Sequence, residues 1–112
     1  MPYIPSIQRK NLDPLIDELA MKVVAESRQQ KNEAAFVGIL NYVCTRLALK
    51  VIRERFGKMR YWIIAAVSGV FSNIADEFYR RVGVPYEDKQ MEKNKDVDLY
   101  SLYVHEIEEE GS

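Results

Sequence analysis

Three groups of polar residues in this sequence have side chains that could bind a ligand. They are Asn41, Tyr42, Thr45 and Arg46; then Asn73, Glu77, Arg80 and Arg81; then Tyr86, Glu87 and Asp88. Guanidinium groups bind phosphate or carboxylate through several donors, amides bind base and sugar edges, and tyrosines stack on planar rings. These residue types predict a site for a nucleotide-like anion. Its ligand-binding candidates are Asn41, Tyr42, Thr45, Arg46, Asn73, Glu77, Arg80, Arg81, Tyr86 and Asp88.

A second interpretation of the same residues is structural. Buried polar groups satisfy one another first, so Arg80 or Arg81 could pair with Glu77 or Asp88 and fix the packing of helices. The sequence leaves both interpretations open.

Catalytic and metal-binding motifs are not found. His105 is the only histidine and Cys44 the only cysteine, so no set of zinc ligands can be assembled from them. Adjacent Asp76 and Glu77 diverge by about 100° on a helix and do not form a carboxylate pair. We expect no enzyme, no metal and no cofactor, with Cys44 as a buried structural thiol.

The basic residues are concentrated in one stretch, 46–60. They are Arg46, Lys50, Arg53, Arg55, Lys58 and Arg60, opposed within the stretch by Glu54 alone, whereas the second half of the chain is acidic. Such a stripe could attract a phosphate-bearing small molecule or a nucleic acid. It could equally neutralise the acidic tail of its own chain or of a neighbouring subunit.

Length and composition predict one soluble domain. The chain has 112 residues, 47% hydrophobic and 29% charged, which is typical of a folded protein. One cysteine suits the reducing cytoplasm, and the first ten residues lack the apolar core of a secretory signal. The uncharged run 61–75 is too short and too polar for a membrane span, so we expect no membrane partner.

The local signals predict three helices. Prolines 2 and 5 indicate an extended arm over 1–12, and the pair Asp13-Pro14 predicts the start of a helix over 13–27. A second helix is expected over 33–56, because Asn32 can cap its start and Gly57 suits its end. A third is expected over 59–82, because Gly83 and Pro85 form a stop signal.

The residues after that stop, 83–112, read as an acidic and partly irregular tail. Within it, residues 99–107 fit a short helix or a strand, with a weak preference for a helix or a docked extension. The fold class expected is therefore all-α, an antiparallel three-helix unit within a single domain over 1–112. Because the second and third helices are apolar on more than one side, we also expect a homo-oligomer.

Several segments resemble a family of small bacteriophage and prophage proteins without an assigned function. The matching segments are MPYIP, LDPLIDELA, LNYVCTRL at 40–47, EFYRRVGVPYEDKQ at 77–90 and NKDV at 94–97. Lys95 stands where this family pattern has a glycine, which argues against a tight turn there. The resemblance implies a phage-type accessory protein in the cytoplasm of the infected host, and it brings no established active site.

Three functional hypotheses follow. The first is a non-enzymatic binder of a small phosphorylated ligand, such as a nucleotide second messenger that it would sequester from a host defence. The second is a structural or interaction module whose apolar faces bind a host or phage protein. The third is a nucleic-acid binder that uses the basic stretch 46–60, although the chain's sequence pI of about 5.9 weighs against it.

Overall fold

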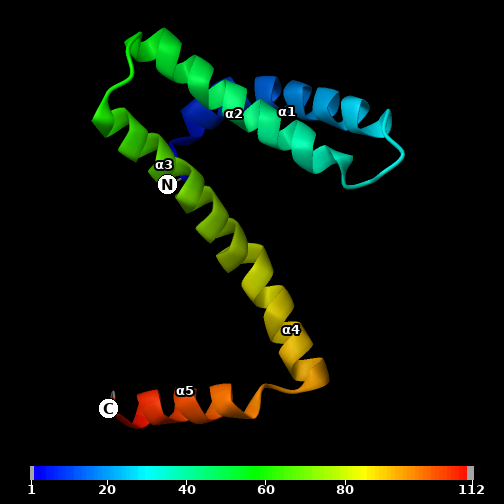
Figure 1. Ribbon diagram of the computed structural model, residues 1–112, viewed down its shortest axis with the longest axis vertical. Helices are drawn as coiled ribbons and strands as arrows, with labels where there is room; N and C mark the ends of the chain where they lie inside the picture. The colour runs from blue at the N-terminus through cyan, green and yellow to red at the C-terminus, as the bar shows by residue number, and fades with distance from the viewer. Residues whose placement is uncertain (1, 111–112) are drawn as a thin grey trace. The chain divides into compact units, whose positions relative to one another are not determined.

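The computed structural model describes residues 2–110, and they are almost entirely helical (Figure 1). The elements are α1 (Ser6–Arg28), α2 (Ala35–Phe56), α3 (Tyr61–Phe78), the π-helical segment η1 (Tyr79–Gly83), α4 (Val84–Asn94) and α5 (Asp98–Glu110). No strand occurs among these residues, which confirms the all-α prediction. Contacts divide the chain into two units, Met1–Phe71 and Ser72–Ser112. The single domain expected over 1–112 stays a prediction.

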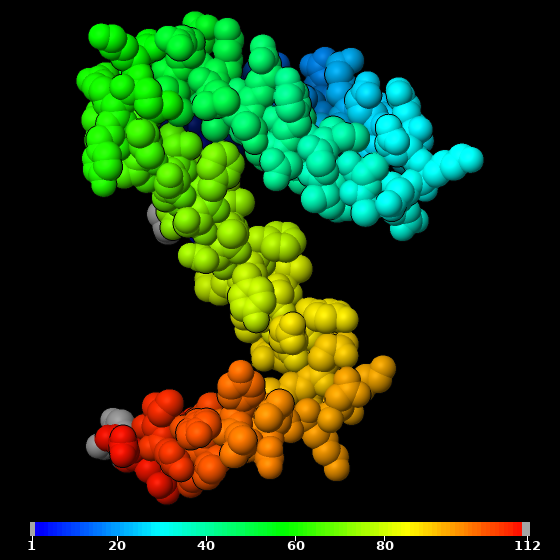
Figure 2. Space-filling model, in the orientation of Figure 1, coloured from blue at the N-terminus to red at the C-terminus, as the bar shows by residue number. Residues whose placement is uncertain are grey.

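In the first unit, α1 and α2 form an antiparallel hairpin (Figure 1). Figure 2 shows the atoms of the two helices in direct contact. The loop between them is fixed by Asn32, whose Oδ1 accepts a hydrogen bond of 3.0 Å from the Ala34 N–H. The predicted capping of the helix by Asn32 is wrong: α2 begins at Ala35, its N-cap is Ala34 and no side chain caps it, so Asn32 orders the preceding loop instead.

The start of α1 corrects the expected arm over 1–12. The helix begins at Ser6, because the Pro5 carbonyl accepts hydrogen bonds from the N–H groups of Gln8 and Arg9 at 3.1 and 3.2 Å. Pro14 consequently lies inside the helix rather than at its start. Both prolines are valid start signals, since each lacks the amide hydrogen that a first turn leaves unpaired. The earlier one begins the helix, and Pro14 interrupts one hydrogen bond within it.

Gly57 ends α2 as predicted. Its φ of 75° lies in a region that favours glycine, and its N–H donates to the Arg53 carbonyl at 3.0 Å. Immediately beyond this cap the chain turns into α3, and the rings of Phe56 and Trp62 meet edge to face with centroids 5.2 Å apart. Among the described residues, only Ile52 of α2 and Ile63 of α3 are buried.

In the second unit, the predicted stop at Gly83 and Pro85 is wrong. The Val84 N–H donates to the Tyr79 carbonyl, five residues earlier, and Gly83 and Val84 both keep α-helical dihedrals. The helical path therefore continues through η1 into α4, with Pro85 in the first turn of α4. In an α-helix the Pro85 ring would clash with the backbone of the preceding turn. The wider π turn relieves this steric clash.

The segment expected to be an irregular tail over 83–112 is mostly helical as well. Lys95 ends α4 with a φ of 70° and a ψ of 155°, a conformation that favours glycine, and residues 95–97 form an irregular link to α5. Asp96 then secures the start of α5: its Oδ1 accepts from the Val97 N–H at 2.7 Å, and its Oδ2 accepts from the Ser101 hydroxyl at 2.6 Å. The weak preference for a helix over 99–107 is confirmed.

Most of the expected core faces are exposed in the single chain. Leu15 of α1, Leu47 of α2 and Ile74 of α3 are all exposed, although each belongs to an apolar stripe. Cys44 is exposed too, which corrects its assignment as a buried thiol. The three-helix arrangement and the homo-oligomer stay predictions.

Candidate anion-binding groove

The first unit contains an open groove of about 450 Å³ along the C-terminal half of α2. It is lined by Tyr42, Thr45, Arg46, Leu49, Lys50, Ile52, Arg53, Gly57 and Met59. Eight of the nine belong to α2 or its cap, and Met59 comes from the turn that follows. Three of the candidate residues, Tyr42, Thr45 and Arg46, are therefore brought together at one surface.

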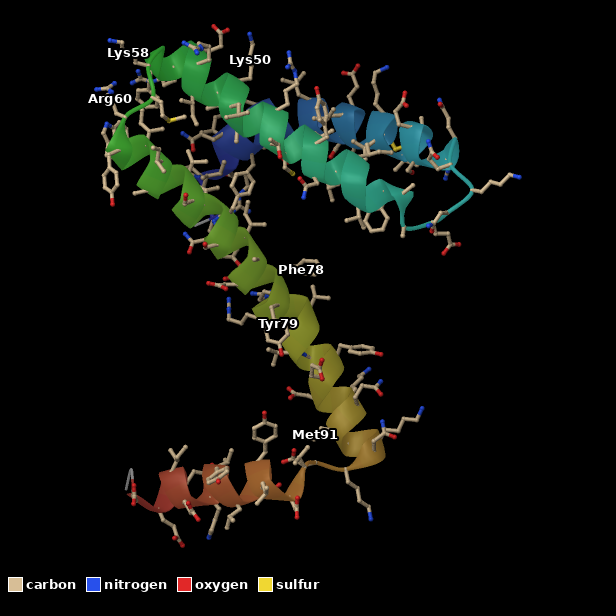
Figure 3. The ribbon with its side chains drawn as sticks, in the orientation of Figure 1. Lys50, Lys58, Arg60, Phe78, Tyr79 and Met91 are labelled. Carbon is tan, nitrogen blue, oxygen red and sulfur yellow. The ribbon has the colours of Figure 1, made fainter. Side chains whose placement is uncertain are left out.

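Three cations line this groove, and their electrostatic surroundings differ. Lys50 projects outward from α2 (Figure 3), and its Nζ lies 2.8 Å from Oε1 of Glu54, with both side chains mostly exposed. Arg53 donates from Nη1 to the Gly57 carbonyl at 2.5 Å. Arg46 has no hydrogen-bond or ion-pair partner among the residues that the structure describes. The groove is therefore positively charged, because the solvent-exposed pair of Lys50 and Glu54 neutralises only part of its charge.

Asn41 and Thr45 are joined by a hydrogen bond across one turn of α2. The Thr45 hydroxyl donates to the Asn41 carbonyl at 2.7 Å, and its oxygen lies 3.5 Å from Asn41 Oδ1. This hydrogen bond to the preceding turn satisfies the polar pair within α2. Thr45 lines the groove, whereas Asn41 does not.

The second group of candidates lies in the other unit. Asn73 and Glu77 belong to α3, Arg80 and Arg81 to η1, and Tyr86 and Asp88 to α4. Arg80 Nη2 donates to Glu77 Oε1 at 2.5 Å, one helical turn away. This pair agrees with the structural interpretation of these residues. Glu77 is partly covered, with 25% of its side chain exposed, while Arg80 is mostly exposed.

Four residues of the groove were not candidates from sequence: Leu49, Ile52, Gly57 and Met59. Lys50 and Arg53 were expected in the basic stretch 46–60 but not grouped with the ligand-binding candidates, although Arg46, Lys50 and Arg53 follow one another at spacings of four and three residues. That spacing places them on one face of a helix and was the available signal. Beside the groove lies a cluster of rings and cations: the Arg55 and Arg60 guanidiniums lie 5.0 and 5.8 Å from the Phe56 ring centroid. Lys58 and Arg60 occupy the turn after α2 (Figure 3).

Two further features bear on the class of site. Within residues 2–110, no group of three or more histidine, cysteine or carboxylate side chains could hold a metal ion. By length and composition alone, α2 is apolar enough to cross a membrane, a test that core helices of soluble proteins also pass. The expectation of no membrane partner therefore stays a prediction.

Comparison with known proteins identifies the family. No curated protein and no solved structure matches the chain. One family model, described as a domain of unknown function (DUF6899), matches residues 1–97, which include all of α1 to α4 and every residue of the groove. The chain belongs to the DUF6899 family.

Proposed function

We propose that this chain is a non-enzymatic binder of a small phosphate-bearing ligand. The observation that carries the proposal is the groove on α2, where Arg46, Lys50 and Arg53 converge beside Tyr42. Arginine and lysine donors bind phosphate oxygens, and a largely apolar floor strengthens such contacts by excluding water. Leu49, Ile52 and Met59 supply that apolar surface here.

The spacing of the polar groups fits an elongated anion. Arg46 and Arg53 are seven residues apart, so their Cα atoms lie about 10 Å apart along the helix. Tyr42 precedes Arg46 by one turn and extends the same row. A nucleotide joins a planar base to a row of phosphates. If the base stacked on the Tyr42 ring, the phosphates would extend along Arg46, Lys50 and Arg53.

The helix dipole opposes this placement. The groove reaches Gly57, beyond the C-terminus of α2, where the unpaired carbonyls carry partial negative charge. Arg53 already donates to one of the carbonyls there, that of Gly57. Arg53 and Lys50 already have partners, so the attraction of the ligand depends most on Arg46.

The biological role that we propose rests on the resemblance to phage proteins. In that role the chain acts in the cytoplasm of the infected host and sequesters a nucleotide second messenger of a host defence. Sequestration requires tight binding without turnover, so the ligand is recovered unchanged.

Calorimetric titration of the full chain with cyclic and linear nucleotides tests the proposal. We expect saturable heat with at least one member and a loss of affinity of about tenfold or more for Arg46→Ala, since a charge-assisted hydrogen bond contributes about 1.5–3 kcal/mol. Arg81→Ala is the control, because Arg81 lies in the other unit. Absence of heat with every member, or loss of binding only in Arg81→Ala, would sink the groove assignment.

A second candidate function is a protein-interaction module, which the exposed apolar residues of α1, α2 and α3 favour. A third is nucleic-acid binding through the stretch 46–60. Titrating a single-stranded oligonucleotide at several salt concentrations separates the third from the first: a nucleic-acid site that contacts several phosphates loses affinity steeply with salt.

A further inference from the structure

The turn between α2 and α3 holds two arginines against aromatic rings. We call Arg55, Phe56, Arg60 and Trp62 the turn cluster, and all four belong to the first unit. The guanidinium carbon of Arg60 lies 5.8 Å from the Phe56 ring centroid and 6.0 Å from that of Trp62. The guanidinium carbon of Arg55 lies 5.0 Å from the same Phe56 centroid. Cation–π attraction therefore holds both cations beside the Phe56 ring.

The charge of these two arginines is not balanced by a neighbouring carboxylate in the sequence. Between Glu54, which pairs with Lys50, and Asp76 the chain contains no acidic residue. Among residues 2–110, neither guanidinium has a hydrogen-bond or ion-pair partner. A contact with a ring leaves the N–H donors of an arginine available, and their planar arrangement matches the oxygens of a phosphate. The turn cluster therefore has the chemistry of a phosphate site.

The turn cluster continues the row of cations that lines the groove on α2. Phe56 follows Arg53 by three residues, so the two side chains lie on the same face of the helix. Arg46 and Phe56 are ten residues apart, which corresponds to about 15 Å along the helix axis. A base-stacked nucleic-acid strand carries one phosphate about every 3.4 Å, so this length fits about four or five phosphates. A single nucleotide spans only part of the row.

We propose that the turn cluster is a second phosphate- and base-binding subsite, and that the ligand is a linear single-stranded oligonucleotide of about four or five nucleotides. This inference rests on the proposed function, because the groove binds the first part of the strand. Arg55 and Arg60 bind its last phosphates. The Trp62 ring, which is 52% exposed, offers a surface on which a base stacks. Stacking accepts every base, so the site selects strand length rather than base sequence.

Calorimetry and tryptophan fluorescence of the full chain test the groove and the turn cluster separately. Trp62 is the only tryptophan, so its fluorescence reports directly on the turn cluster. We expect a linear oligothymidylate of about five nucleotides to quench this fluorescence and to bind about tenfold or more tightly than thymidine monophosphate, because an additional base stacks. The monophosphate should leave the fluorescence unchanged, and a strand twice as long should bind no more tightly than the shorter one.

Two variants that remove one arginine each locate the effect. Arg60→Ala should lose the tenfold gain of the longer ligand, and Arg60→Lys should recover only part of it, because lysine lacks the planar set of donors. Arg28→Ala is the control, since Arg28 ends α1 at the other end of the α1–α2 hairpin and should not affect the gain.

The outcomes separate the two proposals. Binding heat without quenching, equal affinities for the two ligands, a gain that persists in Arg60→Ala, or an equal loss in Arg28→Ala overturns the subsite and leaves the groove in place. Absence of heat with every ligand overturns the proposed function and the subsite together.

Discussion

Gly83 and Tyr79 lie so close together that a Cβ atom on Gly83 would stand 2.5 Å from Cδ2 of the tyrosine ring. Gly83 itself has ordinary α-helical dihedrals, so it is not needed for a positive φ. Its role is to leave room for the Tyr79 ring against the backbone of η1. The sequence pattern that suggested a helix stop thus serves a close approach within a continuous helical path.

Gly83→Ala should lower the free energy of unfolding by about 1–3 kcal/mol, because the Tyr79 ring must leave its position. Gly38→Ala is the matched control, since a Cβ there would meet nothing within 4 Å and α2 would gain about 0.5–1 kcal/mol. Urea unfolding followed by circular dichroism measures both. Equal effects of the two substitutions would contradict the packing role of Gly83.

Lys95→Gly should stabilise the chain by about 1 kcal/mol. The φ of 70° and ψ of 155° at Lys95 belong to a region that only glycine enters without strain. Lys89→Gly, in the interior of α4, removes a similar charge but should cost about 1 kcal/mol, because glycine weakens a helix interior. Opposite signs in urea unfolding confirm the strain at Lys95, and destabilisation by both would refute it.

Asp96→Ala should loosen the start of α5. The substitution removes acceptors for the Val97 N–H and the Ser101 hydroxyl, and each lost hydrogen bond costs about 0.5–1.5 kcal/mol. Amide hydrogen exchange should accelerate in residues 98–110 and stay unchanged in α1. Asp96→Asn keeps an acceptor for Val97 and should show a smaller effect. Unaltered exchange in Asp96→Ala would show that these two hydrogen bonds are dispensable.

Phe56 and Trp62 should be energetically coupled. In a double-mutant cycle with Phe56→Leu and Trp62→Leu, we expect a coupling of about 0.5–1.5 kcal/mol, the contribution of an aromatic pair beyond buried area. Phe36, at the other end of α2, provides the comparison: Phe36→Leu and Trp62→Leu should add independently. A coupling free energy near zero between Phe56 and Trp62 would show that this contact does not stabilise the fold.

Helix periodicity was sufficient to predict the all-α class. It also predicted the end of α2, because Gly57, which marks that end in the sequence, adopts a positive φ that favours glycine. Glycine and proline were ambiguous elsewhere. Pro5 and Pro14 are both compatible with a helix start, and nothing local decides between them. Gly83 and Pro85 fit a stop and a π turn equally, and the choice depends on the packing of Tyr79.

The candidate site was predictable only in part, for a related reason. Tyr42, Thr45 and Arg46 share a stretch of α2, so their proximity follows from helical spacing. The grouping of Arg46 with Met59 depends on how the chain turns after Gly57, which spacing does not determine. Arg80 and Glu77 looked like ligand-binding residues by type, and a bond across one turn accounts for them locally.

The hydrogen bond from Val84 to Tyr79 also changes the helical phase of everything that follows it. A π turn accommodates one residue more than an α turn, so each α4 side chain points about 100° away from its direction in an uninterrupted helix. Tyr86 consequently takes the direction that position 85 would have had. A chain shortened by one residue within η1 could form an uninterrupted α-helix and would keep the present side of α4 in place, so the π turn compensates for one extra residue.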